Sequence, residues 1–115
     1  GFLAVNSIGQ DPFIVTNTVP EISGNLTARF RMKSASGGIG QFFWTTRDAP
    51  NFGPKQRLDF APIHDGQWHE YEIAFVPATT LTGLRLDPSA APGTIQLEWL
   101  RISQEGAVVK EWSFQ

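Results

Sequence analysis

The chain has 115 residues, of which 41% are hydrophobic and 17% are charged, and its formal net charge is -2. This length suits one domain with a core of its own, and the composition is too apolar for a disordered segment. The low charge excludes a protein that binds nucleic acid by neutralising phosphates, and the absence of cysteine excludes disulfides and Cys-based zinc sites.

Apolar and polar residues alternate along much of the chain. In residues 26–33 every second residue, from Leu26 to Met32, is apolar, and the residues between them are polar. A period of two is typical of a strand with one buried face. In chain order, the predicted strands are residues 2–5, 13–16, 26–33, 41–46, 57–61, 70–75, 84–87, 95–102 and 108–114.

Glycine, proline, asparagine and aspartate mark turns between these strands, for example at Asp65-Gly66 and Pro92-Gly93. No stretch of helical length remains between the turns, and no apolar stretch approaches the roughly 20 residues that span a bilayer. The pattern predicts an all-β fold, a sandwich or barrel formed by residues 1–115 as one domain. We expect neither nucleic acid nor a membrane as a partner.

Catalytic motifs are hard to find in this sequence. His64 and His69 are five residues apart across a turn, which is not the spacing of a zinc-binding helix, and a Gly-x-Ser-x-Gly motif is absent. Eleven acidic residues leave a glycosidase pair open, but acidic side chains on strands and turns are mostly solvated. We therefore expect a protein that is not an enzyme.

The remaining side chains suit sugar recognition, because pyranose C–H faces pack on aromatic rings and sugar hydroxyls pair with planar polar groups. In residues 41–47, Phe42 and Trp44 share one face of the strand, whereas Phe43 and Arg47 share the other. The alternation does not show which of the two faces is the core. Sugar binding on this strand thus depends on the direction of Trp44.

Charged residues raise a second question. Arg57 and Asp59 should lie together on the outer side of their strand, either holding a ligand or forming a surface ion pair. The row Arg29, Arg31 and Lys33 is either a site for an anionic glycan or a solvated face. Three tryptophans have an interpretation as core residues. Trp68 either closes the end of the core or stacks on a sugar, and Trp99 and Trp112 belong mainly to the core.

Six segments together resemble the galactose-binding-like jelly-roll modules that are attached to bacterial sulfatases and other polysaccharide-degrading enzymes. The resemblance covers nearly the whole chain. The segments are 8–13 (IGQDPF), 26–33 (LTARFRMK), 40–46 (GQFFWTT), 64–71 (HDGQWHEY), 84–88 (LRLDP) and 112–114 (WSF).

This resemblance implies an antiparallel jelly-roll β-sandwich that forms part of a larger bacterial enzyme and acts outside the cytoplasm, in the extracellular or periplasmic space. It implies a non-catalytic, monomeric module that directs the parent catalytic domain to a poly- or oligosaccharide, with the site on the concave sheet or in the end loops. An anionic glycan carrying sulfate or uronate is expected. The candidate contacts are Trp44, Arg47, Arg57, Asp59, His64, Trp68, His69 and Arg31.

Two further expectations accompany the resemblance. Many relatives hold a structural calcium ion, and the acidic residues nearest to the corresponding segments are Asp11, Asp87 and Glu98. Each has another interpretation, which is turn capping for the two Asp-Pro sites and a solvated face for Glu98. The alternative to glycan binding is a structural accessory domain that packs on a catalytic domain and binds no sugar.

Overall fold

The computed structural model describes residues 3–7 and 14–114, and its strands follow each other with short connections. Within these residues the strands are β1 (Leu3–Ser7), β2 (Ile14–Thr16), β3 (Leu26–Ala35), β4 (Gly40–Thr46), β5 (Arg57–Phe60), β6 (Trp68–Phe75), β7 (Leu81–Asp87), β8 (Gly93–Gln104) and β9 (Ala107–Ser113). One short 3₁₀ helix, η1 (Pro54–Gln56), precedes β5 in this part of the chain.

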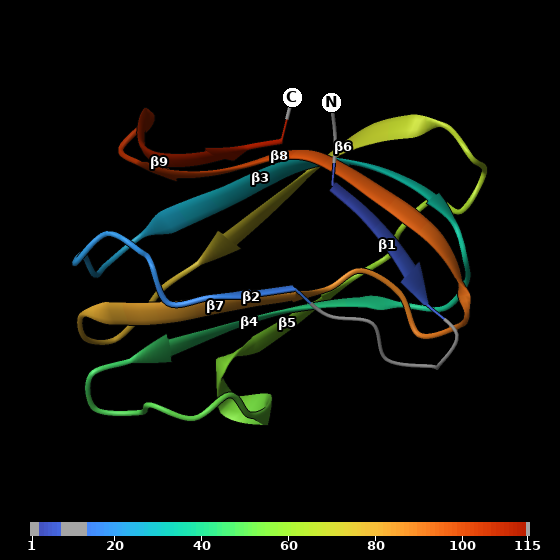
Figure 1. Ribbon diagram of the computed structural model, residues 1–115. Coiled ribbons are helices and arrows are strands. Elements are labelled where there is room, and N and C mark those ends of the chain that lie inside the picture. Colours follow the sequence, from blue (N-terminus) through green and yellow to red (C-terminus); the bar gives the residue numbers. More distant parts are fainter. Residues whose placement is uncertain (1–2, 8–13, 115) are drawn as a thin grey trace.

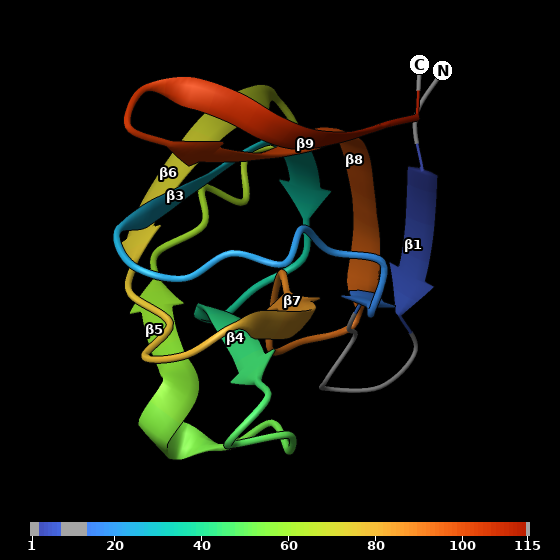
Figure 2. The same ribbon diagram turned by 90° about the vertical axis from the view of Figure 1, so that its left-hand side faces the viewer.

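The strands form two antiparallel sheets that face each other (Figure 1). Sheet A has the order β1-β8-β3-β6, with β9 also paired to β8, and sheet B has the order β2-β7-β4-β5. The first half of the long strand β8 pairs with β1 and its second half pairs with β9. Figure 2 shows β1 beside β8 and the β8–β9 hairpin at the top of the view. The predicted all-β antiparallel sandwich is confirmed.

The predicted strands agree with the observed ones to within a few residues. The clearest prediction, residues 26–33, corresponds to β3, which runs two residues further to Ala35. Phe2 and Phe13, the predicted first residues of the first two strands, lie outside the described residues. The short turn η1 was not predicted, because three residues that start with Pro54 carry no helical periodicity.

The core between the sheets is rich in aromatic rings. Phe75 of β6 lies 5.0 Å from Phe42 and 5.3 Å from Trp44, measured between ring centroids, so it joins the two sheets. Trp44 is only 8% exposed and therefore faces inward. The other large buried side chains of this core include Leu26, Phe30, Met32, Ile73, Leu81, Leu84, Leu86, Ile95, Leu97 and Ile102.

Trp99 and Trp112 occupy different sides of sheet A. Trp112 packs against the core between the sheets, as predicted. Trp99 is buried as well, but it pairs with Arg31 on the outer side of sheet A, and the guanidinium of Arg101 lies 3.8 Å from its ring centroid. Trp99 is therefore covered by an arginine instead of by the opposite sheet.

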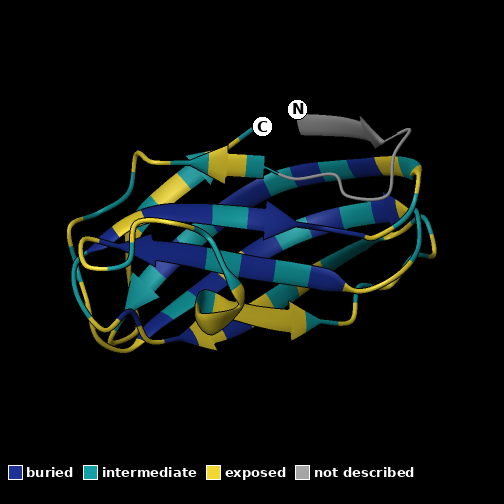
Figure 3. Ribbon diagram, turned by 90° about the horizontal axis from the view of Figure 1, so that it is seen from below, coloured by how far each residue is buried: buried dark blue, intermediate teal, exposed yellow. Residues whose placement is uncertain are grey.

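Sheet B ends in an exposed strand. In Figure 3, which views the molecule from below, β5 and η1 are mostly exposed, whereas the inner strands contain many buried residues. β5 pairs with β4 only from Gly40 to Phe43, so within the described residues no strand lies on the β5 side of β4 from Trp44 to Thr46. This open edge is where the candidate site forms. No helix in the described part of the chain is long and apolar enough to cross a membrane.

We predict that Phe30→Ala lowers the free energy of unfolding by about 3–5 kcal/mol, because it leaves a cavity in the core. Phe30 is fully buried and stacks on Tyr71 at 5.1 Å between ring centroids. Urea denaturation measures the change. The control is Val108→Ala on the exposed side of β9, which should stay within about 0.5 kcal/mol of the parent. Similar changes in the two variants would contradict the observed burial.

Candidate functional site

A pocket of about 560 Å³ opens beside the free edge of β4. It lies between the loop that connects β4 to β5 and the connection from β6 to β7. Trp44 contributes to it from inside the sandwich. The other residues that line it are Ala49, Asn51, Phe52, Gly53, Pro54, Lys55, Gln56, Val76 and Ala78.

The side chain of Gln56 holds the β4–β5 loop against β4. Its Nε2 donates to the carbonyl oxygens of Trp44 at 2.9 Å and Ala49 at 3.2 Å. The turn from Thr46 to Ala49 is closed by reciprocal backbone bonds of 3.1 and 3.2 Å. The amide of Gln56 therefore satisfies a carbonyl that a neighbouring strand would otherwise bind, and the pocket keeps its shape without that strand.

The pocket lining is mainly apolar, with a few polar groups. Trp44, Phe52 and Val76 offer ring and aliphatic surface, while Lys55 and Gln56 offer hydrogen-bonding groups. Both N–H bonds of the Gln56 amide are used by backbone carbonyls, so Oε1 is its remaining acceptor. Lys55 adds three donors and a positive charge. Small-molecule sites commonly combine such an apolar lining with a few polar groups.

A second group of side chains lies on the outer face of sheet B. We call Gln41, Phe43, Arg57, Asp59 and Arg85 the sheet-B patch. Phe43 is the register partner of Arg57 in β5 on one side and of Arg85 in β7 on the other, so it lies between two arginines. The cation–π distance from Arg85 Cζ to the Phe43 centroid is 5.2 Å. Asp59 Oδ1 lies 3.2 Å from Arg57 Nε, so the predicted ion pair on the outer side is present. The same oxygen accepts a hydrogen bond from Gln41 Nε2 at 3.4 Å.

Asp87 fixes the position of Arg85. Arg85 Nε and Nη2 donate to Asp87 Oδ1 and Oδ2 at 2.7 and 3.0 Å, and the Asp87 side chain is only 3% exposed. A two-point contact of this kind sets the plane of the guanidinium. Sequence reasoning missed this pair, although the spacing of two residues on a strand places both side chains on one face.

Phe52 connects the pocket to the sheet-B patch. Its ring lies edge-on to Phe43 with 6.4 Å between centroids, and it also lines the pocket. Gly83 lies beneath: a Cβ there would be 2.7 Å from Thr45 Oγ1 and 3.6 Å from the Phe52 ring. A Cβ at position 83 would thus collide with the Thr45 hydroxyl, whereas its contact with Phe52 would be an ordinary van der Waals contact.

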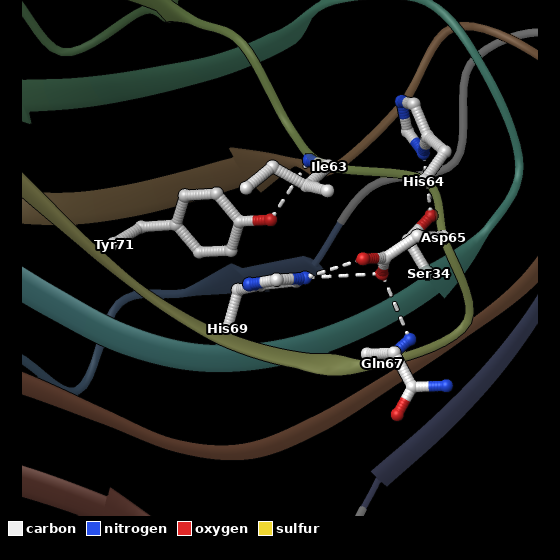
Figure 4. A network of polar contacts seen from close by, with 7 residues as sticks. All are labelled: Ser34, Ile63, His64, Asp65, Gln67, His69 and Tyr71. Atoms are coloured by element: carbon white, nitrogen blue, oxygen red, sulfur yellow. Dashed lines mark hydrogen bonds and ion pairs between the residues drawn. The ribbon is translucent and has the colours of Figure 1, made fainter.

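His64 and His69 lie at the other end of the sandwich, in and after the loop between β5 and β6 (Figure 4). His64 Nε2 donates to the Gly38 carbonyl at 2.8 Å, so Nδ1 of the neutral ring accepts from the Ser34 hydroxyl at 2.7 Å. His69 Nε2 lies 3.0 Å from both carboxylate oxygens of Asp65. Both rings therefore hold the loop in place at the end of the sandwich away from the pocket.

The basic row lies on the outer face of sheet A next to acidic residues. Arg29 and Arg31 contact Glu70 at 3.6 and 3.7 Å, and Arg31 Nε also lies 3.2 Å from Glu98 Oε2. Trp68 is on the same face, with Arg31 Cζ 5.5 Å from its ring centroid. Trp68 therefore does not plug the core, and the two arginines of the row are already neutralised.

The structure does not bring the sequence-predicted contacts into one site. Trp44 and Arg47 lie at the pocket end, and Arg57 and Asp59 belong to the sheet-B patch. His64 and His69 lie at the far end of the sandwich. Trp68 and Arg31 lie on the outer face of sheet A. Phe43, Phe52, Lys55, Gln56 and Arg85 were not among the predicted contacts, and three of them, Phe52, Lys55 and Gln56, lie within the stretch 51–57.

Of the three acids proposed for calcium, the two that lie among the described residues occupy different sheets. Asp87 belongs to sheet B and binds Arg85, whereas Glu98 belongs to sheet A and binds Arg31. Asp11 lies outside the described residues. In residues 14–114 no group of three or more His, Asp or Glu side chains is arranged to hold a metal ion. Asp87 and Glu98 thus do not fit a shared calcium ion.

We predict that Asp65→Asn makes stability less dependent on pH. The backbone N–H of Gln67, and next His69, lower the pKa of Asp65 below its ordinary value. A lowered folded-state pKa adds stability above the unfolded-state pKa of about 3.9, and this stability is lost as the pH falls through the folded-state pKa. Melting temperatures should therefore differ between parent and variant near about pH 6 and converge below about pH 3.

Asp48→Asn, an exposed substitution at the other end of the sandwich, controls for loss of a carboxylate as such. A gap between the parent and Asp65→Asn that stays constant from neutral to acidic pH would contradict the assigned role of Asp65.

Comparison with solved structures identifies the fold. Apo BiXyn10A CBM1 is 18% identical, with a TM-score of 0.60 over 91% of this chain and 74% of that chain. The C-terminal CBM6 of LamC, a marine laminarinase from Zobellia galactanivorans, is 19% identical, with a TM-score of 0.60 over 88% and 79%. The carbohydrate-binding module CBM6cm-2 from Cellvibrio mixtus lichenase 5A, solved with cellotriose, is 18% identical, with a TM-score of 0.54 over 88% and 76%.

No protein-family model matches the sequence, and no curated protein is significantly similar to it. The resemblance to jelly-roll carbohydrate-binding modules is therefore confirmed at the level of the fold, which this chain shares with the carbohydrate-binding modules named above.

Proposed function

We propose that this chain is a non-catalytic carbohydrate-binding module that holds a glycan in the pocket beside β4. The neighbours of the same fold include a module of a laminarinase and a lichenase module solved with cellotriose, which supports this class of ligand. By the same reasoning the module serves a secreted bacterial enzyme that degrades polysaccharide or removes sulfate, and directs its catalytic domain to the substrate.

The pocket is the observation that carries the proposal. Its volume of about 560 Å³ lies within the range of about 300–1,000 Å³ that is usual for small-molecule sites. Phe52 provides apolar surface for the C–H face of a pyranose, Trp44 contributes only the small exposed part of its inward-facing ring, and Gln56 Oε1 accepts a hydrogen bond from a hydroxyl. This combination of rings with a held amide suits a sugar better than a purely apolar ligand.

The sheet-B patch extends the proposed site beyond the pocket. Phe52 contacts Phe43, and Phe43 is flanked by Arg57 and Arg85, so a saccharide chain that leaves the pocket meets planar polar groups next. These groups are fixed by ion pairs with Asp59 and Asp87 and need little reordering. The site is open and the ligand is flexible, so we expect weak binding.

An acidic glycan is the preferred ligand in this proposal, but the cations responsible differ from those expected. Arg29, Arg31 and Arg57 have carboxylate partners. Lys55 lines the pocket itself. Arg47 lies at the same end, beside a polar cleft of about 150 Å³ that Glu21 also lines without forming an ion pair with it. Lys55 and Arg47 are therefore the residues that would attract a uronate or sulfate.

The alternative is an accessory domain that packs on a catalytic domain and binds no sugar. The apolar character of the pocket lining and the exposed Val76 at its rim are consistent with a protein contact there. In that case no glycan binds the isolated chain, and substitutions in the pocket change only its attachment to the neighbouring domain.

We predict that Phe52→Ala weakens glycan binding at least about tenfold, which corresponds to about 1.4 kcal/mol. The change removes a pocket wall and the contact to Phe43. A glycan array first selects the ligand, and isothermal calorimetry then compares parent, Phe52→Ala and the distant control Val108→Ala. Absence of any bound glycan, or equal affinity in the three proteins, would rule out the proposed site.

We predict that Lys55→Gln weakens binding of a uronate-containing oligosaccharide about fivefold, because one exposed charge contact contributes up to about 1 kcal/mol. Binding of the neutral oligosaccharide of the same length should not change. The affinity for the acidic ligand should also fall as salt is raised.

Arg29→Gln is the matched control, because it removes a positive charge that is already paired with Glu70. Equal affinity for neutral and acidic ligands in the parent protein would refute the anionic preference while leaving glycan binding intact.

A further inference from the structure

The outer face of sheet A carries three basic residues in a row, Arg29, Arg31 and Lys33. Of these three, Lys33 is the one whose charge is not paired with a carboxylate among the described residues. Glu70 contacts Arg29 and Arg31, and Glu98 contacts Arg31 as well. Within the described residues, Lys33 makes no ion pair, and its Nζ lies 5.8 Å from the ring centroid of Trp68. The positive potential of this face is therefore concentrated at the Lys33 end of β3.

Lys33 lines a small cleft that is formed by β3, β8 and the β5–β6 loop. The antiparallel register places Trp68 of β6, Lys33 of β3 and Gln96 of β8 in one row, and Ala35 and Thr94 in another. The cleft has a volume of about 90 Å³ and is lined by Lys33, Ala35, Gly66, Thr94 and Gln96. We call it the Lys33 notch.

The notch is built from a rigid frame. Gly66 donates its backbone N–H to the Ser34 carbonyl at 2.8 Å, which holds the β5–β6 loop against the end of β3. Ser34, the residue between Lys33 and Ala35, is buried and bonded to His64. The cleft therefore keeps its width, because the loop and the strand on either side of it are held by hydrogen bonds.

Size and chemistry point to one class of ligand. A volume of about 90 Å³ equals about three water molecules at about 30 Å³ each, which suits a single carboxylate or sulfate group and excludes a whole pyranose ring. The groups that face it include the ammonium of Lys33 and the amide of Gln96, both of which donate hydrogen bonds. We infer that the Lys33 notch binds the carboxylate or sulfate of an acidic saccharide, with the rest of the sugar outside the cleft and close to Trp68.

This second site is separate from the proposed pocket, because it lies on the outer face of sheet A and the pocket lies beside the free edge of β4 in sheet B. It rests on the proposed function only for the class of ligand. Trp68 neighbours Lys33 next to the notch and Trp44 lines the pocket, so their indole N–H signals report on the two sites independently.

The test is titration of the full ¹⁵N-labelled chain with methyl β-glucuronide, with methyl β-glucoside as the neutral probe and with inorganic sulfate. We expect the glucuronide to shift the Trp68 indole signal and the glucoside to leave it unchanged. Lys33→Gln should weaken the glucuronide response at Trp68 about fivefold, which corresponds to the loss of one charge contact of up to about 1 kcal/mol. Arg29→Gln, on the same strand face but paired with Glu70, should retain it.

Three results would overturn the inference: a Trp68 response that persists in Lys33→Gln, an equal response to the glucoside, or inorganic sulfate binding as tightly as the glucuronide, which would indicate an adventitious anion only. A response at Trp68 without one at Trp44 would support the notch while counting against the proposed pocket. The reverse pattern would do the opposite.

Discussion

Phe75 of β6 contacts both Phe42 and Trp44 of β4, and this aromatic contact between the sheets determines the direction of the other side chains on sheet B. Because residues alternate along a strand, Phe43 must then face outward, where it meets the two arginines of the neighbouring strands. Trp44 still forms part of the pocket, because among the described residues β4 has no strand on its β5 side at that position. One packing contact therefore gives rise to both the pocket and the sheet-B patch.

Charge pairing between adjacent strands decides which cations remain for a ligand. β3 carries three basic residues in a row, but the neighbouring β6 and β8 bring Glu70 and Glu98 to the two arginines. The partner of Arg57 is on its own strand. Ligand attraction thus depends on lysines and on Arg47, which lie at strand ends and in loops, where no acidic strand runs alongside.

The two ends of the sandwich are built differently. At one end, His64 ties the β5–β6 loop to Ser34 and Gly38, and His69 pairs with Asp65, so side chains with catalytic or ligand-binding potential are used to hold a loop. At the other end the Gln56 amide and the Thr46 hydroxyl hold the β4–β5 loop, and an open pocket lies beside it. The end with fewer side-chain bonds is the one that has space for the larger pocket.

The sequence by itself determined the strands, their number and the inward-facing row from Leu26 to Met32. Alternation with a period of two is a local property of the sequence, and the residues that form turns mark where each strand ends. It also paired Arg57 with Asp59, which share a strand face. Only the tertiary structure decided that Trp44 faces the core, because residues 41–47 carry bulky groups on both sides and the opposite sheet chooses between them. It likewise decided that Arg31 is neutralised and Lys33 is not, and that Asp87 and Glu98 lie in different sheets, since these facts depend on which distant strands become neighbours.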